Sequence, residues 1–181
     1  MRKLIFDINI TIDGFADHTS GIADDELHDF YTDLLNSADI LLFGRKTYQL
    51  MESFWPVADK DPQSTKSIIR FADKINGLQK IVFSKTLNQV TWNNTKLVKD
   101  NALEEIARLK QESGKNLFVG GISFSSSLMN AGLIDEFWFL IHPIISGKGR
   151  QLFEKLNMTT NVKLQETQVL KSGVVAMHYL K

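Results

Sequence analysis

Three short segments of the sequence place glycine or small polar residues directly after apolar runs, and two of the three, 44–47 and 84–86, also contain basic residues. Two of them, 44–47 and 120–123, stand where a strand would turn into a helix, and the third, 84–86, follows another apolar run. The first N–H groups of a helix lack internal partners and attract anions, and glycine lets an anion approach the backbone. Several such turns predict a dinucleotide with more than one phosphate, and the cations favour NADPH over NADH. The candidate cofactor-binding residues are Gly44, Arg45, Lys46, Thr47, Ser84, Lys85, Thr86, Gly120, Gly121, Ile122 and Ser123.

Few side chains stand where they could act on a substrate beside such a cofactor. Asp13 follows the first apolar strand and could face the substrate catalytically, although an Asp-Gly pair is equally typical of a turn. His28 could donate a proton from the first helix or lie on its polar side. Phe15 and Trp55 fall in loops and could cover a flat ring, although aromatic residues also fill cores. The spacing of the histidines predicts no metal site.

The composition narrows the class of protein. A chain of 181 residues predicts one domain, 1–181. Its 21 basic and 21 acidic residues give no net charge, which argues against a nucleic-acid partner. Cysteine is absent, so disulfides and thiolate chemistry are excluded. No apolar stretch reaches the roughly 20 residues that span a bilayer, so we expect a cytoplasmic protein without a membrane partner.

Hydrophobic periodicity predicts alternating strands and helices, followed by strands alone. The clearest helix, 101–114, has Asn101 as its expected cap, Glu104 three residues later and Gly114 at its end. The order predicts an α/β protein with a mixed, mostly parallel central sheet and antiparallel C-terminal strands. The predicted strands are 3–12, 38–44, 80–86, 95–98, 116–121, 134–145, 161–171 and 173–181, and the predicted helices are 24–36, 45–52, 64–75, 101–114 and 122–132.

The ordered segments ITIDGF, LLFGRKTY, KIVFSKTL, LFVGG and GLIDEFWFLIHPIISGKGRQLF cover most of the chain. With them the sequence resembles the dihydrofolate-reductase-like superfamily, and most of all the reductase domain of the bacterial riboflavin-biosynthesis deaminase-reductase and its stand-alone relatives. The resemblance implies a three-layer α-β-α fold, a homodimer, and NADPH-dependent reduction of a small molecule, 5-amino-6-(5-phosphoribosylamino)uracil. It also implies that 44–47 hold cofactor phosphate, that 84–86 lie near the adenosine end, and that 120–123 follow the pyrophosphate and nicotinamide ribose. A cis peptide is expected between Gly120 and Gly121.

Departures from the pattern leave other functions open. Folate reductases carry an acidic residue where this chain has His28, so dihydrofolate or another pterin is the alternative substrate class. A non-catalytic NADP-binding protein would keep the turns without the chemistry. A serine hydrolase using Ser123 is a further alternative, although the elbow motif lacks its second glycine, with Ser125 in that place. The apolar residues Phe137, Trp138 and Phe139 favour a strand that faces a subunit partner as well as the core.

Overall fold

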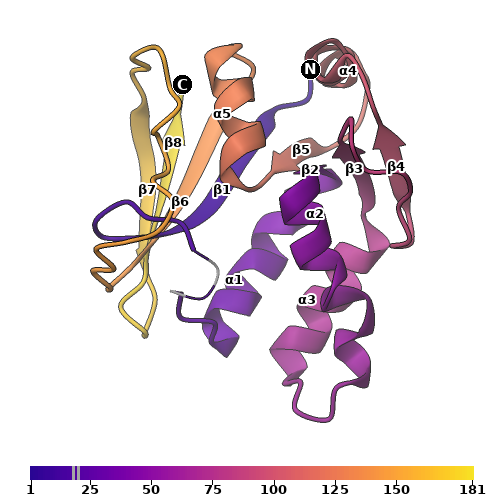
Figure 1. Cartoon of the computed structure of the whole chain (residues 1–181). Coiled ribbons are helices and arrows are strands. Elements are labelled where there is room, and N and C mark those ends of the chain that lie inside the picture. The colour runs from indigo at the N-terminus through magenta and orange to yellow at the C-terminus, as the bar shows by residue number, and fades with distance from the viewer. Residues whose placement is uncertain (18, 20) are drawn as a thin grey trace. The chain divides into compact units, whose positions relative to one another are not determined.

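The computed structural model describes residues 1–17, 19 and 21–181. The chain forms two compact units, shown in Figure 1 and described separately below. Unit 1 comprises Met1–Arg2 and Asp25–Phe118, and unit 2 comprises Lys3–Asp24 and Val119–Lys181. The single domain 1–181 stays a prediction. None of the helices in the described part of the chain is long and apolar enough to cross a membrane.

Unit 1 alternates strands with helices. Its strands follow the order β4-β3-β2-β5, in which β2 pairs parallel with β3 and β3 parallel with β4, and the last residue of β5, Val119, belongs to unit 2. Helix α1 packs against α3, and α2 packs against β2 and β3. The strands are β2 (Ala38–Gly44), β3 (Gln79–Phe83), β4 (Thr95–Val98) and β5 (Asn116–Val119), and the helices are α1 (Asp25–Leu34), α2 (Arg45–Glu52), α3 (Lys66–Gly77) and α4 (Ala102–Gln111), with 3-10 turns η1 (Leu35–Ser37) and η2 (Trp55–Lys60).

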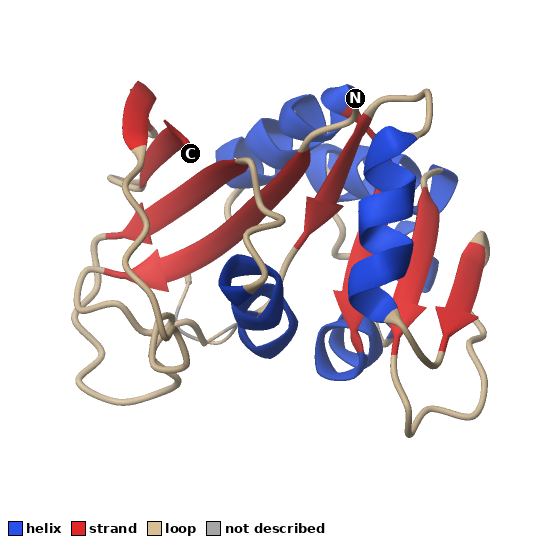
Figure 2. Cartoon of the chain, turned by 90° about the horizontal axis from the view of Figure 1, so that it is seen from above, coloured by secondary structure: helices blue, strands red, loops and turns tan. Residues whose placement is uncertain are grey.

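Unit 2 contains the remaining strands, in the order β1-β6-β8-β7, and helix α5 (Ile122–Asn130). β1 (Leu4–Thr11) runs parallel to β6 (Glu136–His142), whereas β8 (Val175–Leu180) is antiparallel to both β6 and β7 (Lys163–Val169). In Figure 2 the strands of each unit, drawn in red, lie side by side. The predicted α/β class, with parallel strands followed by antiparallel C-terminal strands, is confirmed.

Aromatic packing fills both faces of β6 within the chain itself. Phe6 of β1 meets Phe137 and Phe139 edge to face, with ring centroids 6.4 and 6.1 Å away. On the other face Trp138 stacks on His178 at 4.4 Å. The apolar character of this strand is therefore explained by internal packing, since such aromatic pairs stabilise a core. The predicted homodimer gains no support from it and stays a prediction.

Three local predictions were wrong. Asn101 stands at the start of α4, but it adopts a left-handed conformation with φ of 54° and its side chain makes no capping hydrogen bond. Helix α4 ends at Gln111, three residues before Gly114. A Cβ on Gly114 would lie 2.7 Å from Oδ2 of Asp39, so glycine is needed there for close packing. The predicted strand 3–12 is one residue too long at each end, because β1 runs from Leu4 to Thr11 and Ile12 is 60% exposed.

Candidate functional site

The turn from β2 into α2 leaves a helix N-terminus open. Gly44 is the residue before α2, in an extended conformation, and no side chain caps the helix. Arg45 and Lys46 are exposed on the first turn, and neither makes a hydrogen bond or ion pair with any described residue. The first backbone N–H groups of α2 and the side chains of Arg45 and Lys46 are hydrogen-bond donors that suit a phosphate. Thr47 adds a partly accessible hydroxyl on the same turn.

Segment 84–86 lies at the same edge of unit 1. Gly44 pairs in register with Phe83, so Ser84 follows β3 at the level where α2 begins. The Ser84 hydroxyl accepts hydrogen bonds from the backbone N–H groups of Thr86 and Leu87, at 3.3 and 3.0 Å. It therefore closes a local turn. Lys85, exposed and without a described partner, is the member of this segment that remains available to an anion.

Gly120 and Gly121 form the corresponding turn before α5 in unit 2. Gly121 has φ of 85° and ψ of 159°, a conformation that essentially only glycine adopts, and no side chain caps α5. The expected cis peptide between the two glycines is wrong, because no cis bond occurs in the described residues. The positive φ at Gly121 achieves the sharp turn instead. Ile122 is buried and anchors the helix, whereas Ser123 is exposed.

A cation that the sequence did not single out lies beside this turn. Arg150 donates a hydrogen bond from Nη2 to Oγ of Ser123 at 2.7 Å. Among the described residues no histidine or carboxylate bonds to Ser123. A serine nucleophile needs such a base within hydrogen-bond reach. The hydrolase alternative therefore finds no support in the geometry.

Asp13 clamps two loops of unit 2 together. Its carboxylate accepts hydrogen bonds from the Thr11 hydroxyl at 2.6 Å and from the backbone N–H groups of Ser146 and Gly147, at 3.1 and 2.7 Å. These bonds, that of Thr11 first, lower the pKa of Asp13 to about 2. These contacts hold Asp13 as a carboxylate, and its catalytic and substrate-binding roles stay predictions. Phe15 belongs to the same clamp, because its backbone forms an antiparallel bridge with Gln151.

His28 and Trp55 meet in unit 1. The two rings pack edge to face with centroids 5.9 Å apart, and Phe71 lies 6.1 Å from His28. Nδ1 of His28 is buried and has no hydrogen-bond partner. A buried polar atom without a partner is costly, so it marks a position where a ligand could bond. The sequence therefore identified two residues that do lie together, in one aromatic cluster with Phe71.

His142 anchors the loop that precedes α1. The imidazole is buried, its Nδ1 accepts from the Ile22 N–H at 2.9 Å, and its Nε2 lies 2.9 Å from Oδ1 of Asn9. This arrangement requires the neutral ring, protonated on Nε2, because an imidazolium could not accept from Ile22. Burial lowers the pKa of His142, opposed by the negative charge of Asp24. The contacts are those of a structural histidine.

The free energy of unfolding should depend on pH through His142. Since its pKa is lowered in the folded state, the unfolded chain binds the proton first as the pH falls through its ordinary value of 6.5. The stabilisation is therefore complete above that pH and is lost below it. We expect the wild type to lose stability relative to His142→Gln as the pH falls from about 7 to about 5, measured by urea unfolding. A constant difference between the two proteins over this range would contradict the assignment.

Asp7 is a second ionisable residue that the sequence did not single out. It lies in the middle of β1, paired in register with Trp138, and is partly accessible. Burial raises the pKa of its carboxyl to about 7, and the backbone of the same residue opposes this weakly. No hydrogen bond or ion pair of its side chain occurs in the described part of the chain. Perturbed carboxyls of this kind are found most often at functional sites.

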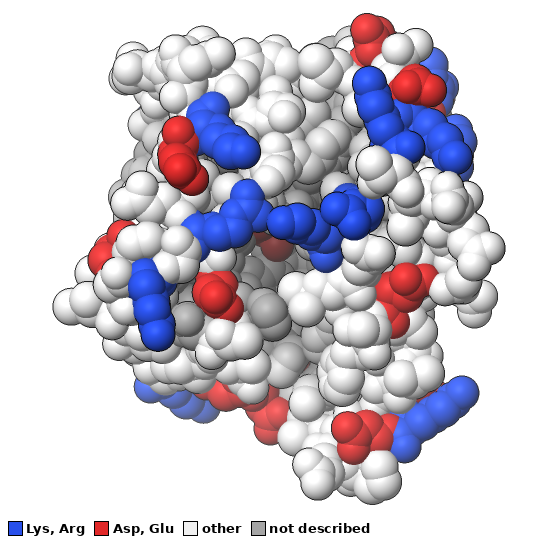
Figure 3. All heavy atoms as spheres, viewed as in Figure 1, with Lys and Arg blue, Asp and Glu red and all other residues white. Residues whose placement is uncertain are grey.

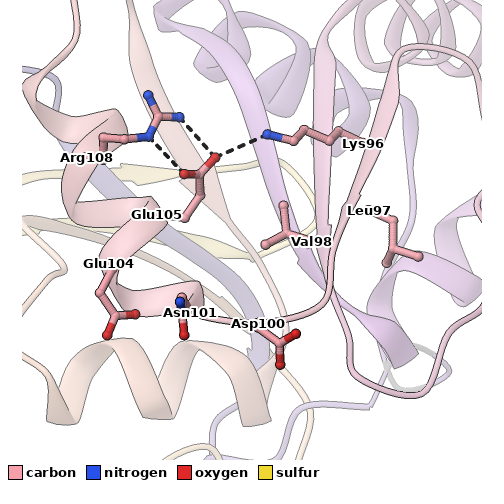
Figure 4. Close-up of a pocket in the computed structure, with 8 residues that line it drawn as sticks. All are labelled: Lys96, Leu97, Val98, Asp100, Asn101, Glu104, Glu105 and Arg108. Carbon is pink, nitrogen blue, oxygen red and sulfur yellow. Dashed lines mark hydrogen bonds and ion pairs between the residues drawn. The ribbon is translucent and has the colours of Figure 1, made fainter.

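A shallow groove between β4 and α4 contains none of the predicted site residues. Figure 4 shows Arg108 and Lys96 pointing toward Glu105, which Arg108 bonds at 2.9 and 3.0 Å and Lys96 at 3.3 Å. These bonds, that of Arg108 first, lower the pKa of Glu105 to about 2. Both cations of the groove are thus paired with Glu105. Its lining residues are Lys96, Leu97, Val98, Asp100, Asn101, Glu104, Glu105 and Arg108.

The surface charges elsewhere are mixed. On the face seen in Figure 3, Lys and Arg side chains are interspersed with Asp and Glu side chains. No group of three or more His, Asp or Glu residues that could hold a metal ion occurs in the part of the chain described. Arg45, Lys46 and Lys85, which bond no described residue, are therefore distinguished by their position after the ends of strands. A large basic surface does not surround them.

The chain is similar in sequence to known proteins. A family model described as the RibD C-terminal domain matches residues 2–176. The chain is 35% identical to the uncharacterized protein YyaP of Bacillus subtilis strain 168, over 98% of this chain and 94% of YyaP. It is 28% identical to the uncharacterized protein YwjB of the same organism, over 99% and 98% of the two chains.

Solved structures share the fold. A putative riboflavin biosynthesis protein from Shewanella sp. PV-4 superposes with a TM-score of 0.73 at 20% identity, covering 98% of both chains. A pyrimidine reductase-like protein from Corynebacterium diphtheriae gives 0.70 at 14% identity, covering 99% of this chain and 91% of its own. A deaminase/5-amino-6-(5-phosphoribosylamino)uracil reductase from Thermotoga maritima gives 0.65 at 17% identity, covering 99% of this chain and 56% of its own.

Proposed function

Since the chain belongs to the RibD C-terminal domain family, we propose that it is an NADPH-dependent reductase of a small heteroaromatic or carbonyl compound. The observation that carries the proposal is the pair of uncapped helix N-termini behind Gly44 and Gly121, the first of them accompanied by Arg45 and Lys46, which bond no described residue. When bound, NADPH supplies two electrons and one hydrogen as hydride. The protein contributes binding, orientation and a proton.

The residues present fit a dinucleotide phosphate. Arg45, Lys46 and the first N–H groups of α2 would bond one phosphate, and Lys85 would bond another. In unit 2, Gly121 exposes backbone N–H groups, and Ser123, bonded to Arg150, adds a hydroxyl beside a cation. The chemistry of these donors supports an anionic cofactor.

The substrate would be recognised by the aromatic residues around His28. Trp55 can pack against a flat ring, and the orphaned Nδ1 of His28 can bond its polar edge. An imidazole replaces the carboxylate that the folate reductases use, which favours a substrate other than dihydrofolate. We propose 5-amino-6-(5-phosphoribosylamino)uracil as the first substrate to test, because a solved structure of the same fold bears that reductase name.

The proposal is tested by turnover. NADPH oxidation should accelerate with 5-amino-6-(5-phosphoribosylamino)uracil and should not accelerate with dihydrofolate, with the change in nicotinamide absorbance as the readout. Turnover of dihydrofolate alone would favour the pterin alternative. Saturable NADPH binding with no turnover of either compound would favour the non-catalytic alternative. We also propose that the protein forms a homodimer, which this turnover experiment does not address.

A further inference from the structure

Strand β7 of unit 2 is an open sheet edge. It is the last strand in the order β1-β6-β8-β7, and β8 is its one paired neighbour in the described part of the chain (Figure 1). Every residue of Lys163–Val169 is exposed, so the described residues leave this edge uncovered. An edge strand presents backbone N–H and C=O groups that a further strand can bond.

A bulge at Gln165 brings two opposite charges of β7 to one face. The register skips Gln165, and Lys163 and Glu166 lie opposite positions 180 and 178 of β8. Because these positions are two residues apart, both charged side chains project on the same face of the sheet. In a regular strand, residues three apart project on opposite faces, so the bulge is responsible for this arrangement. The apolar Leu164 lies opposite Tyr179 and projects on the other face.

The two charges of β7 are not used inside the chain. Neither Lys163 nor Glu166 makes a side-chain hydrogen bond or ion pair with a described residue. The ionisable residue that faces them from β8 is His178, which is bonded to Glu136 at 2.9 Å. A basic and an acidic side chain, on one face of an uncovered edge, are therefore available to a complementary surface.

We propose that β7 is the surface through which two copies of this chain associate, by antiparallel pairing of their two β7 strands. With the two-fold axis between positions 164 and 165, Lys163 lies opposite the partner's Glu166, and the symmetry repeats this pair. Directly opposite residues of an antiparallel pair share a face, as these two do. On the other face, the exposed Leu164 meets its own copy near the axis and is removed from water.

The order of the charges favours a second copy over an unrelated strand. The strand reads basic and then acidic from its N-terminus, so its reversed copy presents an acid to the base and a base to the acid. Main-chain hydrogen bonds between the two edges supply affinity, and the charges set the register. This inference rests on the proposed homodimer, for which it names the surface, and does not depend on the reductase activity.

Charge reversal tests the pairing of the two residues. Lys163→Glu and Glu166→Lys each place like charges opposite one another twice in the interface. We expect each to raise the dissociation constant of the dimer at least about tenfold, measured by sedimentation velocity at low salt. The combined variant restores opposite charges, and such coupling should return the constant to within about threefold of the wild type.

Lys155→Glu and Glu154→Lys are the matched controls. They make the same changes of charge at exposed positions of unit 2 outside β7, and should dimerise as the wild type does. A wild type that is monomeric at every concentration would contradict the proposed homodimer and the inference with it. A dimer that the β7 variants weaken no more than the controls do would overturn the inference alone. A combined variant as weak as the single ones would also overturn it.

Introduced thiols give a second measurement, because the chain contains no cysteine. Lys163→Cys combined with Glu166→Cys should form disulfides between two copies, seen as a dimer on a non-reducing gel. Within one strand the two positions are about 10 Å apart, too far for a disulfide inside one copy. Lys163→Cys alone places its two thiols equally far apart across the axis and is the control. Equal cross-linking of the two variants, or none in either, would overturn the inference.

Discussion

Replacing Arg45 and Lys46 together by alanine is expected to weaken NADPH binding by roughly 100-fold while leaving the fold unchanged. Both side chains are exposed on the first turn of α2 and bond no described residue, so no internal contact is lost. A hydrogen bond to a charged group contributes roughly 1.5–3 kcal/mol, and each 1.4 kcal/mol changes a dissociation constant about tenfold. Titration of NADPH followed by nicotinamide fluorescence gives the two dissociation constants.

Lys60→Ala with Lys66→Ala is the matched control for this variant. Both lysines are exposed and lie in unit 1, but neither belongs to a predicted cofactor segment. The control should bind NADPH as the wild type does, at the same ionic strength. Equal affinity of the Arg45 and Lys46 double variant and this control would show that the turn after β2 does not hold the cofactor.

Gly121→Ala is expected to abolish measurable NADPH binding and to lower the free energy of unfolding by about 1–3 kcal/mol. The backbone at Gly121 has φ of 85° and ψ of 159°, which an alanine adopts only under strain. Relieving that strain would move the first N–H groups of α5 away from their present direction. Urea unfolding and the same fluorescence titration measure the two effects.

Gly120→Ala tests whether a ligand lies close to the turn without changing the conformation of the turn. Gly120 has no positive φ, and a Cβ there would make an ordinary contact of 3.8 Å, so this variant should unfold like the wild type. If the cofactor lies against the turn, the added methyl group should still weaken NADPH binding. Unchanged binding in Gly120→Ala would mean that the cofactor does not approach this backbone closely.

The order and type of the elements follow from the sequence because local patterns determine them. The predicted helix 45–52 matches α2 from its first residue to its last, since an apolar strand, a glycine and a polar first turn mark its start. Helix α4 shows the limit of such patterns. Asn101 adopts a left-handed conformation, and Gly114 is required by its contact with Arg2 and Asp39, which lie far away in the sequence.

The candidate site likewise contains features that the sequence predicts and features that depend on tertiary contacts. The glycine turns before α2 and α5 can be predicted from the sequence because they depend on local backbone geometry. The bonds of Asp13 to Ser146 and Gly147 could not be predicted, because these partners are more than 130 residues away in the sequence. Asp7 is visible in the sequence only as a charge within an apolar strand. Its raised pKa comes from burial, which the tertiary structure creates.

The most direct test of the account is a titration of the wild-type protein with NADPH, with NADH as the comparison. The uncommitted cations at 45, 46 and 85 suit a ligand that carries the additional 2′-phosphate. The account predicts a saturable rise in nicotinamide fluorescence with NADPH and an affinity for NADH at least about tenfold weaker. Absence of saturable NADPH binding would contradict the assignment of these turns to a dinucleotide.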